Sequence, residues 1–134
     1  MKNLKYTTLF VLSLFFTTTQ LLAQGALDKQ VFNISIVEKN RMGDPKKLKG
    51  DISFNDGKID ASIIRENDFS KADYTTTEKS GMVTKIITFK GESEGKKDII
   101  EWEGTVNGDE IEGTATRKRK GTIRTIYEFK GTLK

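Results

Sequence analysis

The stretch WEGTVNGDEIEGT, residues 102–114, is nearly symmetric about its centre, with one glycine on each side of an Asn-Gly-Asp turn. A tight hairpin whose two-residue tip is Gly108 and Asp109 brings the apolar side chains of its two strands face to face. The predicted pairs are Val106 with Ile111, Gly104 with Gly113 and Trp102 with Ala115. A tip one residue earlier, at Asn107 and Gly108, would set Val106 against Asp109 and turn the wrong face inward.

In this register Gly104 and Gly113 are inward neighbours that lack side chains. Inward glycines allow strands to coil sharply, or allow a nearby aromatic ring to lie over the backbone. The rings expected at this place are Tyr127 and Trp102.

Apolar and polar residues alternate along most of the chain, which predicts about eight strands. The predicted strands are residues 31–37, 52–54, 59–63, 73–78, 82–90, 99–106, 111–115 and 122–133. Short antiparallel strands with one apolar face favour an all-β, up-and-down, eight-stranded barrel, because closure removes the exposed edge strands. A two-sheet β-sandwich is the alternative.

The connections between these strands complete the prediction. FNDGKI, residues 54–59, is expected to form a tight hairpin that pairs Phe54 with Ile59. RKRKG, residues 117–121, fits a three-residue loop that ends in a glycine bulge. The pairs expected from that loop are Ala115 with Ile123, Gly113 with Thr125 and Ile111 with Tyr127. Residues 40–50 are expected to be a polar connector, and residues 65–72 a loop or a single helical turn.

The start of the chain has the pattern of a secretory signal peptide. Lys2 and Lys5 precede an apolar run at residues 7–16, which is too short to span a membrane, and small residues follow it. Cleavage after Ala23 leaves a single β-barrel domain at residues 24–134, and cleavage after Gly25 is the alternative. No cysteine follows the apolar run and no second run exists, so neither a lipid anchor nor a membrane span is expected. The protein is predicted to be exported to the periplasm or the cell exterior.

Composition excludes several kinds of chemistry. The chain has no cysteine and no histidine, which rules out disulfides, histidine-based catalytic triads and the usual zinc sites. A net charge of only +4 on a heavily charged chain argues for solubility and against nucleic acid as a partner. We expect no catalytic residue, no metal and no cofactor.

The segments ISFNDGKIDASII, IIEWEGTVNGDEIEGT and YEFKGTLK together resemble a family of small exported barrel proteins of Bacteroidota-type bacteria, largely uncharacterised. The shared pattern is a W-x-G-x-V-x-G-D-x-I-x-G-T hairpin and a closing F-x-G strand. In this chain it falls on Trp102, Gly104, Val106, Gly108, Asp109, Ile111, Gly113, Thr114, Phe129 and Gly131. The resemblance covers about residues 50–134 and implies a broadly lipocalin-like barrel and export, but no activity. The G-x-W of true lipocalins is missing from the first strand.

A small apolar ligand inside the barrel would meet the inward side chains. The candidate ligand-binding residues are Phe54, Tyr74, Lys85, Trp102 and Tyr127. A barrel of about eight strands has an interior that is either filled by side chains or holds one small ligand. Four of the candidates have an alternative role: Trp102 as a core ring, the tyrosines as amphipathic core residues, and Lys85 as a residue that reaches water at the rim.

Two charged groups are the remaining candidates. Arg117, Lys118, Arg119 and Lys120 form an anion patch that could contact phosphates, with a solvated hairpin turn as the alternative. The hairpin around Gly108 and Asp109 has an outer face lined by Glu101, Glu103, Glu110 and Glu112. Outward carboxylates of this kind mostly serve solubility, so catalysis is not expected from them.

The sequence thus favours an exported, non-enzymatic barrel that binds a small apolar or amphipathic ligand. The alternative is a protein-binding module, such as a hydrolase inhibitor or a cell-envelope interaction protein, acting through residues 65–72 or 117–120. An enzyme built on carboxylates ranks third. A hollow interior would favour the ligand, and a filled interior would favour the loops.

Overall fold

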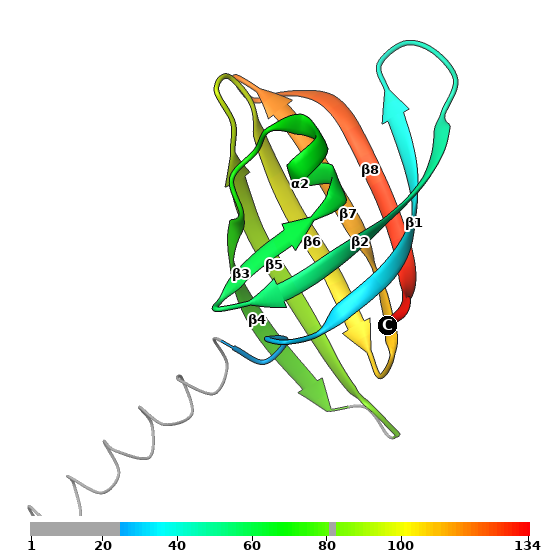
Figure 1. The fold of residues 1–134 in the computed structure, drawn as a ribbon, viewed down its shortest axis with the longest axis vertical. Helices are drawn as coiled ribbons and strands as arrows, with labels where there is room; N and C mark the ends of the chain where they lie inside the picture. The colour runs from blue at the N-terminus through cyan, green and yellow to red at the C-terminus, as the bar shows by residue number, and fades with distance from the viewer. Residues whose placement is uncertain (1–24, 81–82) are drawn as a thin grey trace, which may run out of the picture.

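The computed structural model describes residues 25–80 and 83–134. The segment predicted as a signal peptide therefore lies outside the described residues. Eight antiparallel strands follow one another around a closed barrel, because β1 pairs with both β2 and β8 (Figure 1). The strands are β1 (Val31–Asn40), β2 (Lys46–Asn55), β3 (Lys58–Ala61), β4 (Ala72–Ser80), β5 (Lys85–Glu94), β6 (Ile99–Asn107), β7 (Glu110–Arg119) and β8 (Thr122–Leu133). The predicted all-β, up-and-down barrel is confirmed.

The β6–β7 hairpin, which contains residues 102–114, has the predicted register. Val106 lies opposite Ile111, Gly104 opposite Gly113 and Trp102 opposite Ala115. Gly108 begins the tip at φ +61, a left-handed conformation that glycine adopts without strain. The second predicted hairpin is also confirmed, since Phe54 pairs with Ile59 across Asp56 and Gly57.

Aromatic rings lie over the inward glycines, as expected, but they are not the expected rings. Phe89 faces Gly104 from β5, and Phe129 faces Gly113 from β8. A Cβ atom added to Gly104 would lie 2.6 Å from Cζ of Phe89, and one added to Gly113 would lie 2.9 Å from Cζ of Phe129. Tyr127 and Trp102 were the wrong rings because the residue directly opposite a glycine on the next strand is the one that covers it.

The predicted register between β7 and β8 is wrong. The hairpin has a two-residue tip, Lys120 at φ +50 and Gly121 at φ +78, and β7 continues through Arg119. The pairs are Ala115 with Tyr127, Gly113 with Phe129 and Ile111 with Gly131. An irregularity at Arg117 and Lys118 restores the inward and outward alternation after this tight turn. Two successive residues with positive φ match the right-handed twist of the flanking strands. The two-residue turn is therefore more favourable than the predicted three-residue loop.

Two connector predictions also need correction. Residues 46–50 belong to β2, and they pair with β1 from Ile34 to Glu38. The strand predicted at residues 59–63 ends at Ala61, where helix α2 (Ser62–Asn67) begins. Residues 65–72 thus include the helical turn that was one of the two alternatives. Asp68, at φ +61, ends the helix.

The core lies on the inner side of the barrel, where the buried apolar side chains form one cluster. The largest fully buried side chains include Trp102, Phe32, Phe54 and Phe89. Ile63 and Ile64 of α2 are buried at one end of the barrel, and Leu27 is buried near the turn between β2 and β3, where Lys29 N–H donates to the Phe54 carbonyl. The helix and the N-terminal turn therefore add apolar side chains to the same core.

Candidate functional site

Four of the five residues predicted to contact a ligand are buried in the core: Phe54, Tyr74, Trp102 and Tyr127. Phe54 packs edge-on against Tyr74 and Phe89, with ring centroids 5.1 Å apart in each pair. Trp102 is 1% exposed, lies 5.9 Å from the Phe129 ring, and donates its indole N–H to Ser93 Oγ over 3.0 Å. All four candidates belong to one buried hydrophobic cluster.

Both described tyrosines are buried and tied to carboxylates. The Tyr74 hydroxyl donates to Asp28 Oδ1 over 2.6 Å, and Asp28 also accepts from the backbone N–H of Gly57. Burial raises the pKa of Tyr74 well above its usual range, and the Asp28 carboxylate adds to the shift. Burial also raises the pKa of Tyr127, with a further rise from the charge of Glu38.

Raised tyrosine pKa values predict an alkaline limit to stability. The folded state holds the phenol protons more tightly than the unfolded state does, so this contribution is present below about pH 10 and is lost as the pH rises above it. In the chain expected after signal-peptide cleavage, residues 24–134, the tyrosines are Tyr74 and Tyr127, so phenolate absorbance should rise together with loss of the β-sheet circular dichroism signal. Ionisation of both tyrosines near pH 10 with the dichroism signal unchanged would contradict the assignment.

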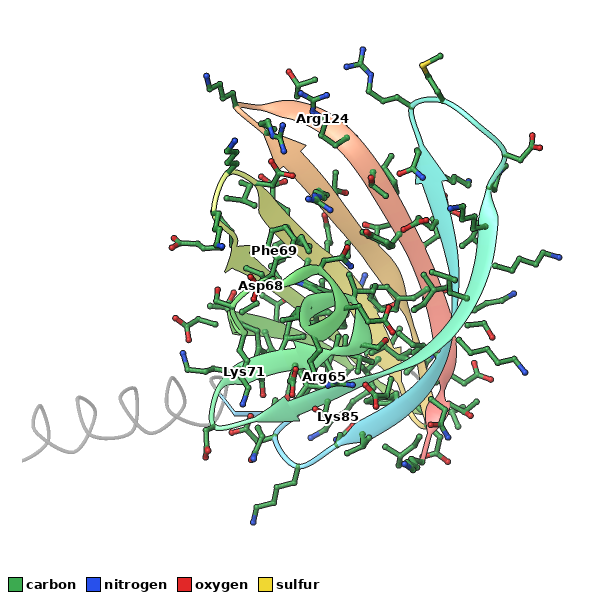
Figure 2. All side chains as sticks on the ribbon, turned by 45° about the horizontal axis from the view of Figure 1, so that its top comes forward. Arg65, Asp68, Phe69, Lys71, Lys85 and Arg124 are labelled. Carbon is green, nitrogen blue, oxygen red and sulfur yellow. The ribbon has the colours of Figure 1, made fainter. Side chains whose placement is uncertain are left out.

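Lys85 does not join the other four candidates. It is the first residue of β5, at the end of the barrel, and its side chain is exposed. Figure 2 places Lys85 well apart from Phe69 and Arg124. Phe89 lies on the inward face of β5, as predicted, whereas Lys85 begins the strand and lies at the rim of the barrel. The structure therefore does not support a role for Lys85 inside a ligand cavity.

The anion patch is divided by the strand that carries it. Arg117, Lys118 and Arg119 belong to β7, where neighbouring side chains point to opposite faces, and only Lys120 lies in the turn. Lys118 projects outward and contacts Glu101 over 2.8 Å. Arg117 and Arg119 project to the other face. The alternative of a solvated turn therefore holds for Lys120 alone.

Arg117 and Arg119 share one buried carboxylate. Arg117 Nε donates to Asp98 Oδ2 over 2.6 Å, and Arg119 Nε donates to Asp98 Oδ1 over 2.5 Å. The Asp98 side chain is 4% exposed, so both of its oxygens depend on these partners. The hydrogen bond from Arg119, followed by that from Arg117, lowers the pKa of Asp98 below its usual range, and Asp98 in turn raises the pKa of Arg119. We call Asp98, Arg117 and Arg119 the Asp98 cluster.

Phe69 connects this cluster to the segment after α2. The Arg117 guanidinium carbon lies 5.2 Å from the centroid of the Phe69 ring, which is a cation–π distance. The hollow beside them has a volume of about 230 Å³ and is lined by Asn67, Asp68, Phe69, Gly95, Lys96, Lys97 and the Asp98 cluster. Figure 2 shows Asp68 and Phe69 directly after α2. The two segments proposed from sequence as contact surfaces, residues 65–72 and 117–120, therefore meet at one end of the barrel.

No known family model, curated protein or solved structure matches this chain. The expected relation to exported Bacteroidota-type barrels therefore stays a prediction. None of the helices in the described part of the chain is long and apolar enough to cross a membrane. Within residues 25–80 and 83–134, no group of carboxylates is arranged to hold a metal ion.

The outer wall carries two further hollows, of about 590 and 760 Å³, over β6, β7, β8 and β1. Their linings include Glu103 and Glu112, two of the outward carboxylates predicted from sequence. Glu103 is exposed and lies 4.0 Å from Lys90. These carboxylates lie at the surface, where water and dissolved ions screen their charges.

Proposed function

We propose that this protein is an exported, non-enzymatic binding module that contacts a partner protein through one end of its barrel. The proposed contact surface, which we call the loop end, consists of residues 62–72, 95–98 and 117–121. The observation that carries the proposal is the contact between Phe69 and Arg117, because it joins two segments far apart in sequence into one surface. Binding residues are commonly found on loops held by a rigid scaffold.

The packing of the interior supports a surface role over carriage of a ligand. Phe54, Tyr74, Trp102 and Tyr127 are each at most 4% exposed, and none of them lines any of the three hollows described above. An apolar ligand would have to displace side chains that already pack at close range. Ligand sites are usually formed before the ligand arrives, and they enclose most of its surface.

The loop end also offers the groups that protein interfaces use. Arginine and aromatic side chains are enriched among the residues that contribute most to binding. Here Arg117 and Phe69 are held against each other, so less side-chain freedom is lost when a partner binds. Lys96 and Lys97 line the same hollow, and Lys71 follows Phe69 by two residues; all three lysines are exposed.

Site-specific photo-crosslinking in the host cell tests this proposal. A benzophenone amino acid replaces Lys71, an exposed residue of the loop end, or Lys79, an exposed lysine further along β4. The expected result is one discrete protein adduct from position 71 and none from position 79. Adducts of equal yield from both positions, or none from either, would count against the loop end as the contact surface.

Carriage of a small apolar ligand is the competing proposal, and native mass spectrometry of the protein purified from its host separates the two. A barrel whose interior is filled by its own side chains should give the mass of the chain alone. A companion mass of a few hundred daltons that is lost on denaturation would instead favour the carrier.

A further inference from the structure

The hollow at the loop end carries an excess of positive charge. Lys96, Lys97 and the two arginines of the Asp98 cluster line it, and only Asp68 and Asp98 oppose them. At about 230 Å³ it is smaller than the roughly 300–1,000 Å³ of sites that enclose a drug-sized molecule. Its size and its charge therefore suit a small anionic group better than an apolar compound.

The two guanidinium groups are fixed before any ligand arrives. Asp98 engages each arginine through Nε, so the terminal nitrogens are not used by this carboxylate, and Arg117 also has a side-chain hydrogen bond to the Tyr127 hydroxyl. Within the described residues, Arg119 makes no other side-chain hydrogen bond, and its terminal N–H groups are therefore available. Arg117 is held a second time by the ring of Phe69. Donors held in place in this way lose little freedom when they bind.

The charge that remains identifies the ligand class. Asp98 neutralises one arginine, and Asp68 offsets one lysine, which leaves about two positive charges around the hollow. A carboxylate brings one negative charge, whereas a phosphate monoester brings about 1.5 to 2 at pH 7 and three acceptor oxygens. Arginine forks bind phosphate oxygens in pairs, and lysines add point charges.

We propose that the hollow beside the Asp98 cluster binds a phosphate group as its dianion. The terminal nitrogens of Arg119 and Arg117 donate to two of the phosphate oxygens, and Lys96 and Lys97 close over the third. This site goes beyond the proposed partner contact, because free phosphate can fill it with no protein partner present. The phosphate comes either from solution or from an ester on a larger molecule.

NMR titration of the ¹⁵N-labelled protein tests the proposal at low ionic strength. The probes are inorganic phosphate and glucose 6-phosphate, with sodium acetate at matched ionic strength as the control. Saturable shifts are expected at the amides of Phe69 and of residues 95–98 with at least one phosphate probe, and not with acetate. Shifts with inorganic phosphate alone identify the free anion, and shifts with the sugar phosphate identify esters as ligands too.

Matched variants assign the site to its residues. Arg119→Gln removes one proposed donor, and Lys120→Gln removes the same charge from the adjacent turn. The first should weaken phosphate binding about tenfold, as expected for loss of one charge-assisted hydrogen bond, while the second should change it less than about twofold. Equal effects of the two variants, no saturable shift with either phosphate probe, or equal shifts with acetate would overturn the proposal.

A second substitution guards against loss of the fold. Lys96 and Lys97 are exposed turn residues, so a Lys96→Gln/Lys97→Gln variant should keep the fluorescence of buried Trp102 and still lose phosphate affinity. Unchanged affinity in this folded variant would remove the lysines from the site and, with them, the charge argument for a dianion.

Discussion

Replacing Gly113 with alanine is expected to destabilise the protein by about 3 kcal/mol or more, at the upper end of overpacking effects. The added Cβ would lie 2.7 Å from Cα of Gly104 and 2.9 Å from Cζ of Phe129, and it would also collide with the Glu103 carbonyl oxygen. Two of these three contacts are with backbone atoms of β6, which can move only if the strands separate. A loss of this size is a large share of the about 5–15 kcal/mol that stabilises a typical domain.

Chemical denaturation followed by Trp102 fluorescence measures this loss. Gly121→Asn is the matched control, because Gly121 lies in open space in a left-handed turn that asparagine tolerates. The control should unfold within about 1 kcal/mol of the wild type. A Gly113→Ala protein as stable as the control would show that β6 and β7 do not approach as closely as described.

Replacing Trp102 with alanine should cost about 3–5 kcal/mol, since it leaves a large cavity among buried side chains. It also removes the hydrogen bond to Ser93, whose side chain is fully buried. A buried hydroxyl without a partner adds to the loss. Denaturation followed by circular dichroism gives the free energy of unfolding, because this variant has no tryptophan.

A double-mutant cycle separates the hydrogen bond from the cavity. Trp102→Phe keeps an aromatic ring near Phe129 but loses the N–H donor. Ser93→Ala should therefore destabilise the wild type more than it destabilises the Trp102→Phe protein, with a coupling energy of about 1 kcal/mol. Additive effects would mean that the indole N–H and the serine hydroxyl are not partners in solution.

Local patterns predicted the architecture well wherever a turn and its flanking residues agreed. The hairpin around Gly108 was predicted in full because only one tip position turns Val106 and Ile111 to the same face. The predicted register of the hairpin around Lys120 was wrong because basic residues occupy both faces of β7 there. No alternation of apolar and polar residues marks where the strand ends.

The candidate site depended on contacts that no local pattern contains. Asp98 follows two lysines in a polar turn, and its role arises from arginines about twenty residues later on β7. Phe69 stands among polar residues, so its ring gave no periodic signal. One signal was available: within a strand, Arg117 and Arg119 share a face and require an acidic partner when that face is buried.

The pairing of the first strand with the last has a consequence for when this protein can fold. Phe32 lies opposite Leu133, and the backbone N–H of Lys134 donates to the Val31 carbonyl. While the chain is being made, β1 has its second neighbour only once residues 122–133 have left the ribosome. Until then the barrel has two open edges, and contacts between distant residues are slow to form. The barrel can therefore close only once β8 is available, whereas the hairpins between consecutive strands can form before it.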